Sequence, residues 1–204
     1  ARKDKHPPII AICDISGSMS RYSRMLLHFM HVLTTLRNDV HTFLFGTRLT
    51  NVTRFLRFKD VDEALAATSS AVEDWSGGTR IGDCLKEFNF NWSRRVLGPG
   101  AIVLFITDGL DRGGGIGLSK QIKLIQKSSK RLIWLNPLLR YEEFAPKATG
   151  VKAILPNVDE FRPIHSLESM DQLVNALSET NLRSRFNMAP WLQKLSEIEN
   201  AECQ

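Results

Sequence analysis

The sequence has few cysteines: Cys13, Cys84 and Cys203 are the only three in 204 residues. Three are too few for a disulfide framework, and none has the paired spacing of a zinc site. We therefore expect a reduced, cytoplasmic protein in which Cys13 is a small buried residue.

Long apolar runs are also missing. No stretch approaches the roughly 20 apolar residues of a membrane-spanning helix, so we expect no membrane span. The basic start, residues 1–6, is not followed by the apolar segment of a signal peptide. We interpret residues 1–8 as a basic linker. Because the sequence lacks an initiator methionine, we expect that it begins inside a longer chain or after processing.

Base-stacking aromatic residues are absent from the most basic stretch, residues 120–131. The net charge of +5 would suit a nucleic-acid partner. However, the lysines of this stretch alternate with Leu118, Ile122 and Ile125 at helical spacing. This pattern favours the exposed face of an amphipathic helix, and without stacking aromatics we expect no nucleic-acid partner.

What is present is the pattern of one α/β domain, with 43% hydrophobic and 24% charged residues. Continuous apolar runs at residues 9–13 and 101–106 are typical of strands buried on both faces. Further strands are predicted at residues 40–45, 49–58, 131–135 and 151–155. Helical spacing predicts helices that cover residues 25–36, 60–75, 81–96, 118–130, 141–148 and 166–178.

The alternation of strands and helices predicts a doubly wound, mostly parallel six-stranded sheet with helices on both faces. Residues 49–58 would form its one antiparallel edge strand. We assign this domain to residues 9–180. The tail, residues 181–204, contains a short amphipathic helix around Trp191 and Leu195, which we expect to pack on the domain.

Oxygen-bearing side chains follow two predicted strands and precede one helix. Asp14, Ser16 and Ser18 come after the first strand, Asp108 comes after the strand at residues 101–106, and Thr79 precedes a helix. Ligands of open α/β sheets bind outside the carboxyl ends of the strands, so these five residues should converge. Each segment alone is a common turn or cap; their conjunction indicates a metal site.

The five ligands offer two carboxylates and three hydroxyls, which suit Mg²⁺, or else Mn²⁺ or Ca²⁺. Imidazole and thiolate are missing, which makes zinc and copper poor candidates. Such a shell leaves one position for an external ligand. An acidic side chain from a partner protein is the natural occupant.

The segment Asp14-Ile15-Ser16-Gly17-Ser18 resembles the D-x-S-x-S motif of von Willebrand factor A domains, their metal-ion-dependent adhesion site (MIDAS). Thr79 and Asp108 match the later threonine and aspartate of that site. Every position of the motif is filled, and the resemblance extends over about residues 9–180. It implies a protein-binding module that has no reaction of its own.

Residues 13–23, 45–50, 74–82 and 132–138 resemble more closely the CoxE-like subgroup of bacterial A domains. That resemblance implies a cytoplasmic maturation factor that works with a MoxR-type AAA+ ATPase on a client metalloenzyme, such as carbon monoxide dehydrogenase. Members of the subgroup carry further sequence before this domain. The glycine-rich loop that begins at Asp111 departs from the expected pattern, and we leave Asp111 outside the site.

Two other functions remain as alternatives. A Mg²⁺-dependent phosphotransferase of the haloacid-dehalogenase type would use Asp14 as nucleophile. It would need a second carboxylate where Ser16 stands, and a lysine for which Lys120 is the candidate. Nucleotide binding by the glycines at residues 113–117 would require the Lys-Ser/Thr pair of a P-loop, which is missing. Arg80, beside Thr79, either attracts an acidic partner or forms a surface ion pair.

Overall fold

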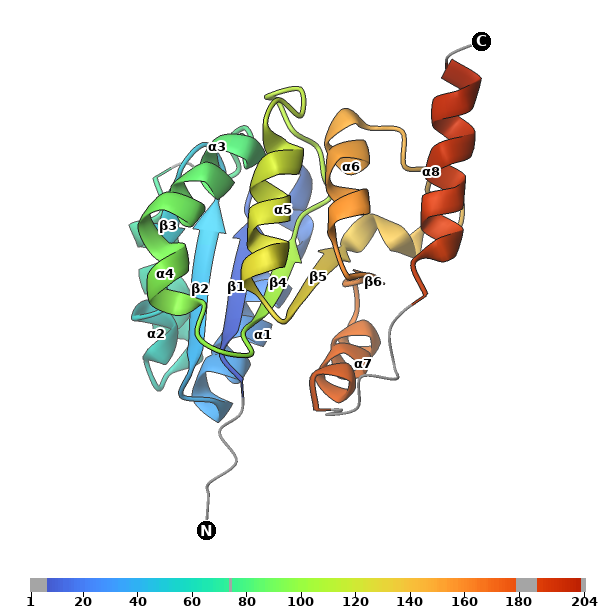
Figure 1. Cartoon of the computed structure of the whole chain (residues 1–204). Coiled ribbons are helices and arrows are strands. Elements are labelled where there is room, and N and C mark those ends of the chain that lie inside the picture. The colour runs from blue at the N-terminus through green and yellow to red at the C-terminus, as the bar shows by residue number, and fades with distance from the viewer. Residues whose placement is uncertain (1–6, 74, 179–186, 203–204) are drawn as a thin grey trace.

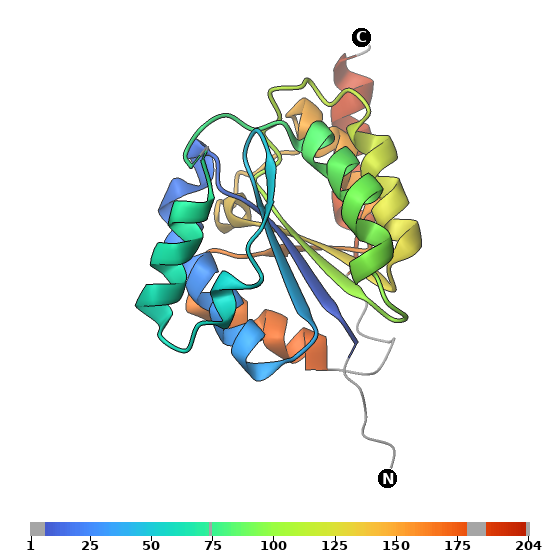
Figure 2. The same ribbon diagram turned by 90° about the vertical axis from the view of Figure 1, so that its left-hand side faces the viewer.

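The computed structural model describes residues 7–73, 75–178 and 187–202. One sheet runs through the middle of the molecule, and helices cover both of its faces, as Figure 1 and Figure 2 show. This arrangement confirms the predicted α/β class.

The strands of the sheet are β1 (Ile9–Asp14), β2 (Val40–Phe45), β3 (Leu49–Asn51), β4 (Ile102–Ile106), β5 (Arg131–Asn136) and β6 (Glu160–Pro163). Their spatial order is β3-β2-β1-β4-β5-β6. Every neighbouring pair is parallel except β2 and β3. The predicted six-stranded sheet with one antiparallel edge strand is therefore confirmed. β1 and β4 are buried along their whole length, which explains why their sequences are continuously apolar.

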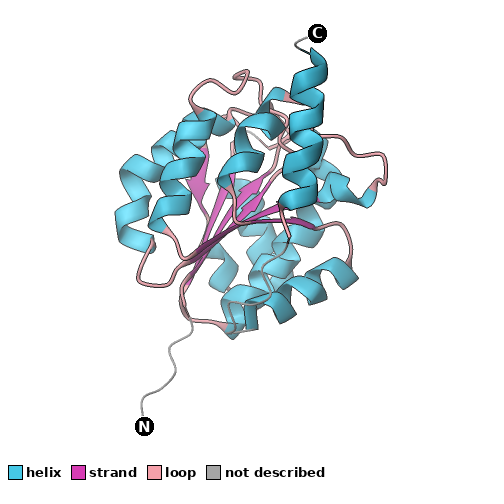
Figure 3. Ribbon diagram, turned by 45° about the vertical axis from the view of Figure 1, so that its right-hand side comes forward, coloured by secondary structure: helices cyan, strands magenta, loops and turns pink. Residues whose placement is uncertain are grey.

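The helices form two layers, with the strands between them (Figure 3). One layer contains α1 (Ser20–Leu36), α2 (Val61–Ala71) and α7 (Leu167–Ser178). The other contains α3 (Ile81–Glu87), α4 (Ser93–Val96), α5 (Leu118–Ser128), α6 (Thr149–Ile154) and α8 (Ala189–Glu202). A hydrophobic core lies between the sheet and each layer; we call the one under α1, α2 and α7 the first core and the other the second core. Successive side chains of a strand point to opposite faces, so Cys13 of β1 packs in the first core and Ile12 in the second.

The basic helix α5 has the amphipathic character that its sequence predicts. Leu118, Ile122 and Ile125 are buried against the sheet, while its lysines are exposed. Among the described residues, no helix combines the length and the apolar character needed to cross a membrane.

The predictions for residues 141–155 were wrong. Residues 141–148 form turns and extended chain, not a helix, because Pro146 lacks the N–H that a helix needs. Residues 151–155 are not a strand: α6 covers most of them. Val151, Ile154 and Leu155 are buried, and their spacing of three and four residues is that of one helix face.

The last strand, β6, lies instead at Glu160–Pro163, where the sequence is charged. Glu160 is buried, and its carboxylate accepts hydrogen bonds from Arg131 on β5 and from Arg162. Pro163 is tolerated because β6 is an edge strand. A charged residue such as Glu160 is not typical of a buried strand, so the sequence pattern did not indicate β6. In the structure the ion pairs with Arg131 and Arg162 compensate its charge.

The predicted edge strand at residues 49–58 is shorter than expected, since β3 ends at Asn51. The Thr53 hydroxyl donates to the Asn51 side chain over 2.7 Å and accepts from the backbone N–H of Thr42 over 3.0 Å. The bond to Thr42 holds the chain against β2 just after β3 ends, and Phe55–Arg57 then forms a 3-10 turn.

The amphipathic tail packs on the domain through α8. Leu195 is buried in the second core, and the ring of Trp191 contacts those of Phe161 and Phe144 at centroid distances of 5.1 and 5.8 Å. The expected domain boundary at residues 180–181 and most of the expected linker, residues 1–6, lie outside the described residues. These boundaries stay predictions.

Two of the cysteines, Cys13 and Cys84, are buried free thiols. Burial, followed by the charge of Asp14, raises the pKa of the Cys13 thiol. Cys13 is therefore the small buried residue that the sequence predicts, and Cys203 lies outside the described residues.

The loop after β4 touches the start of α6 at two glycines. Gly109 has a φ of +81°, which favours glycine. A Cβ atom on Gly150 would lie 2.2 Å from the carbonyl oxygen of Gly109, which is far inside van der Waals contact. The absence of a side chain at Gly150 therefore sets how closely this loop approaches α6.

We expect Gly150→Ala to lower the free energy of unfolding by about 3 kcal/mol, because backbone must move to admit the new methyl group. Gly114→Ala is the matched control: Gly114 has a φ of +63° but open space around it, so its cost should be about 1 kcal/mol. Urea unfolding of both variants measures the difference. Equal losses would contradict the steric explanation.

Candidate metal centre

Asp14 and Asp108 lie at the carboxyl ends of two neighbouring strands. Asp14 is the last residue of β1, and Asp108 follows β4 by two residues. β1 and β4 are adjacent and parallel, whereas the chain continues from β1 to β2 on the opposite side. The two aspartates therefore stand where the strand order reverses. Figure 1 shows β1 and β4 side by side in the middle of the sheet.

Asp14 is completely buried and accepts hydrogen bonds at both carboxylate oxygens. Its Oδ1 accepts from the backbone N–H of Ser16 over 2.8 Å, and its Oδ2 accepts from the Thr107 hydroxyl over 2.7 Å. Thr107 in turn accepts from the N–H of Gly109 over 3.1 Å. Thr107 thus orients the carboxylate, a role that the sequence analysis missed although Thr107 lies beside Asp108.

The two serines follow Asp14 in a tight turn. Ser16 is buried, Ser18 is exposed, and their hydroxyl oxygens are 3.3 Å apart. A short 3-10 turn, Gly17–Met19, then leads into α1. Both hydroxyls therefore lie close together at the end of β1.

Thr79 is brought to the same place by backbone hydrogen bonds between loops. Ser76 N–H donates to the Ile15 carbonyl over 3.1 Å, and Gly17 N–H donates to the Gly77 carbonyl over 3.2 Å. Thr79 itself is buried. These bonds fix the loop before α3 against the loop after β1.

Asp108 is buried, and its Oδ1 accepts from the backbone N–H of Leu110 over 3.0 Å. The Asn136 amide donates to the Asp108 carbonyl over 3.3 Å. Among the described residues, neither Oδ2 of Asp108 nor the Thr79 hydroxyl has a hydrogen-bond partner in the protein. Both atoms thus remain available to a ligand.

Asp111 ties the third loop to the other two. Its Oδ1 accepts from the N–H of Ile81 at the start of α3, and its Oδ2 accepts from the N–H of Gly115, each over 3.0 Å. The next residue, Arg112, donates its N–H to the Thr79 carbonyl over 3.0 Å. Asp111, which the sequence analysis left outside the site, is therefore a positioning residue that joins the loop after β4 to the start of α3.

The three loops and residues 148–150, at the start of α6, line an open cavity of about 590 Å³. Its lining comprises Ser16, Gly17, Ser18, Ser76, Gly77, Gly78, Thr79, Leu110, Asp111, Arg112, Ala148, Thr149 and Gly150. The three predicted hydroxyl residues thus line one space beside the two buried carboxylates. Lys120, which a phosphotransferase would need, is exposed on α5 and does not line it.

The donor set fits a hard divalent cation. Carboxylate and hydroxyl oxygens are the ligands that Mg²⁺ and similar ions prefer. No cluster of three or more His, Cys, Asp or Glu residues suited to a metal occurs in the described parts of the chain. At this site the hydroxyls of Ser16, Ser18 and Thr79 are the side chains at hand to add to the two carboxylates.

Burial strongly affects the charge of Asp14. Burial raises the pKa of this carboxyl from 3.8 to about 6; hydrogen bonds from Ser16 and Thr107 lower it, and the nearby charge of Asp108 raises it. Among the described residues, no lysine or arginine forms an ion pair with either aspartate. The Asp14 carboxyl is therefore costly to ionise without a bound cation.

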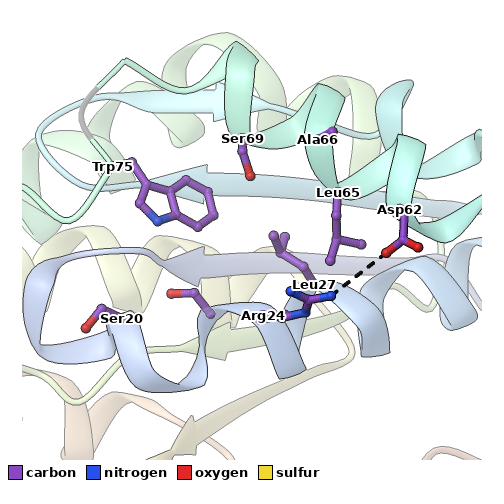
Figure 4. A pocket seen from close by; sticks show the side chains of 9 residues that line it. Ser20, Arg24, Leu27, Asp62, Leu65, Ala66, Ser69 and Trp75 are labelled. Carbon is purple, nitrogen blue, oxygen red and sulfur yellow. Dashed lines mark ion pairs between the residues drawn. The ribbon is translucent and has the colours of Figure 1, made fainter.

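Trp75 faces a different hollow from the one that the hydroxyls line. It borders a space of about 360 Å³ between α1 and α2, together with Leu27 and Leu65 (Figure 4). Arg24 and Asp62 form an ion pair across that space, with 3.9 Å between Nη2 and Oδ1. The adjacent Ser76 and Gly77, by contrast, line the cavity at the aspartates.

Comparison with known families identifies this arrangement. The model of the family described as "VWA domain containing CoxE-like protein" matches residues 1–170, which is most of the chain. The chain belongs to this family. The CoxE-like resemblance that the sequence motifs suggested is thus confirmed.

Solved structures share the fold of this CoxE-like VWA domain. A von Willebrand factor type A protein from Catenulispora acidiphila is 15% identical with a TM-score of 0.58, over 85% of this chain and 42% of that one. Proximal thread matrix protein 1 from the mussel byssus is 18% identical with a TM-score of 0.55, over 85% and 47%. The same mussel protein with a zinc-occupied MIDAS motif is 17% identical with a TM-score of 0.54, over 85% and 47%.

At these identities the similarity shows the fold alone. The CoxE-like VWA domain spans less than half the length of these solved chains. No curated protein sequence matches it.

The pKa of Asp14 predicts an unusual pH dependence for the CoxE-like VWA domain in EDTA. The unfolded chain releases this proton near pH 3.8 and the folded chain near pH 6. Between these values the folded state binds more protons, so its stability should fall as the pH rises and level off above pH 6. The difference between the two pKa values corresponds to a change of about 3 kcal/mol in the free energy of unfolding.

Asp14→Asn removes this titration. In EDTA at pH 7.5 we expect the variant to be more stable than the wild type, and its stability should lack the decline between pH 4 and 6 that Asp14 contributes. Chemical unfolding across this pH range measures the difference between the two proteins. Parallel curves for wild type and variant would contradict the prediction.

Proposed function

We propose that this chain is a metal-dependent protein-binding module in which Asp14, Ser16, Ser18, Thr79 and Asp108 hold a divalent cation. The observation that carries the proposal is the pair of buried carboxylates at neighbouring strand ends, beside a cavity lined by the three hydroxyl residues. Membership of the CoxE-like VWA family supports the same function.

The residues of the site divide the work. Thr107 and the N–H of Ser16 hold the Asp14 carboxylate in place, while Oδ2 of Asp108 and the Thr79 hydroxyl are available to a cation. A bound cation would supply an electrophile with one position open to the cavity. We propose that an acidic side chain of a partner protein occupies that position, and that no reaction of the chain's own follows.

The identity of the cation is part of the proposal. Mg²⁺ suits the all-oxygen donor set, with Mn²⁺ and Ca²⁺ as alternatives. The mussel protein with a zinc-occupied MIDAS motif indicates that zinc belongs in the comparison as well. This weakens the sequence-based argument against zinc, which rested on the absence of imidazole and thiolate.

The cellular role that we propose follows from the family. The module acts in the bacterial cytoplasm as a maturation factor, together with a MoxR-type AAA+ ATPase. Its client is a metalloenzyme such as carbon monoxide dehydrogenase. The family match supports this proposal. The lysines of α5 lie on its solvent-exposed face, and we propose no nucleic-acid partner.

We expect Asp14→Ala to weaken cation affinity at least about 100-fold, since losing even a residue that supports a metal ligand costs about 10–100-fold. Calorimetric titration with Mg²⁺, Mn²⁺, Ca²⁺ and Zn²⁺ measures this loss. Asp171→Ala, which removes an exposed acid on α7, is the control.

Binding of the partner protein should depend on the bound cation. The wild type should retain a MoxR-type ATPase in a pull-down with Mg²⁺ and lose it in EDTA, and Asp14→Ala should retain none. Circular dichroism checks that the variant is folded. Retention in EDTA by both proteins would rule out a metal-dependent module.

Asp111→Asn should weaken cation affinity about tenfold although Asp111 is not a proposed ligand. The change places an NH₂ group opposite the N–H of Ile81 or Gly115, so the loop that holds Thr79 loses an anchor. Calorimetry measures the affinity, with Asp83→Asn on the exposed side of α3 as control. An unchanged affinity would show that the loop needs no such anchor.

A further inference from the structure

An arginine lines the cavity that contains the hydroxyl residues. Arg112 follows Asp111 in the loop after β4 and borders the same space as Ser16, Ser18 and Thr79. Its backbone N–H donates to the carbonyl oxygen of Thr79 over 3.0 Å. The backbone of Arg112 is therefore fixed to a residue that we propose as a metal ligand.

The Arg112 side chain lies across Gly78. A Cβ atom built on Gly78 would stand 2.8 Å from Nη1 of Arg112 and 3.0 Å from its Cζ. These distances are shorter than real contacts allow, so a side chain at position 78 would displace the guanidinium. Glycine at this position lets the charged group lie against the loop that carries Thr79.

Arg112 has no anionic partner within the described ranges, 7–73, 75–178 and 187–202, and its side chain is exposed. Its neighbour Asp111 forms no ion pair with it; the two Asp111 carboxylate oxygens accept backbone hydrogen bonds from Ile81 and Gly115 instead. A guanidinium offers planar, paired N–H donors that match a carboxylate. The Arg112 guanidinium thus has a defined position and no ion-pair partner among the described residues, so it can bind an anionic group of a ligand.

The cavity is large enough for more than a single carboxylate. Its volume of about 590 Å³ lies within the roughly 300–1,000 Å³ of ligand sites. Its lining includes the hydroxyl residues of the proposed cation site together with Arg112, whose guanidinium lies against Gly78. A ligand with one acidic group would leave the arginine unpaired.

We propose that Arg112 is a second anchor for the partner and selects segments with two neighbouring acidic residues. One carboxylate takes the open position of the cation, and the other pairs with Arg112. This inference rests on the proposed function and adds to it a specificity-determining residue and the chemistry of the segment that is bound.

Two synthetic peptides test the inference: acetyl-Glu-Glu-Glu-amide and acetyl-Gln-Glu-Gln-amide. Each is titrated into isotope-labelled protein at saturating Mg²⁺ and low ionic strength, and binding is followed by nuclear magnetic resonance. We expect the wild type to bind the triglutamate peptide about tenfold more tightly, because a charge-assisted pair is added. Salt should reduce this preference.

Arg112→Gln should abolish the preference and leave binding of the single-glutamate peptide and of Mg²⁺ unchanged. Gly78→Ala should reduce the preference by displacing the same guanidinium. Arg80→Gln is the matched control, since Arg80 is an exposed arginine beside Thr79 that does not line the cavity. It should keep the preference.

Three outcomes overturn the inference: equal binding of both peptides by the wild type, an undiminished preference in Arg112→Gln, or no binding of the triglutamate peptide. A failure of the proposed function looks different. In that case neither EDTA nor Asp14→Ala would alter the binding of the single-glutamate peptide. The two failures are therefore distinguishable in one set of titrations.

Discussion

The site depends on two carboxylates, Asp14 and Asp108, that are buried side by side without a basic partner among the described residues. Burial makes the charge of Asp14 costly, as its raised pKa shows. The fold tolerates them because the ends of β1 and β4 supply donors: the Ser16 N–H and the Thr107 hydroxyl for Asp14, and the Leu110 N–H for Asp108. These bonds reduce the electrostatic cost without removing it. A divalent cation is the ligand that would remove it, so the same constraint that limits the stability of the metal-free protein favours metal binding.

The three loops that carry the site residues are held together mostly by backbone hydrogen bonds. The loop after β1 is bonded to the loop before α3. The loop after β4 is then joined to that second loop through the Asp111 carboxylate and the Arg112 N–H. A carboxylate that spans two loops explains how a glycine-rich segment keeps a defined shape. The flexibility that its glycines suggest is limited by Asp111, which the sequence analysis left outside the site.

The sequence predicts this fold best where burial alone decides the structure. β1 and β4 are buried on both faces, so a continuous apolar run identifies them. β6 was missed because ion pairs with Arg131 and Arg162 satisfy its buried Glu160, and the partner on the neighbouring strand, Arg131, lies 29 residues away in the chain. At the site, strand ends and motif spacing locate Asp14 and Asp108. Thr107 was missed because its partner lies 93 residues away, a relation that only the register of β1 against β4 creates.

Charge connects the site to the surface around it. Two carboxylates balance a divalent cation, so a loaded site would be close to neutral and would not by itself attract an acidic partner from a distance. The chain as a whole carries +5, and Arg112 is an exposed arginine whose backbone N–H donates to the Thr79 carbonyl. Under the proposed function, long-range attraction comes from the net positive charge of the whole chain, whereas the cation would act only at contact. Salt should accordingly slow the association with a partner, because it screens the surface charge. Chelation of the cation should instead remove the bond between cation and partner carboxylate. The two treatments therefore distinguish the role of the surface charge from that of the metal site.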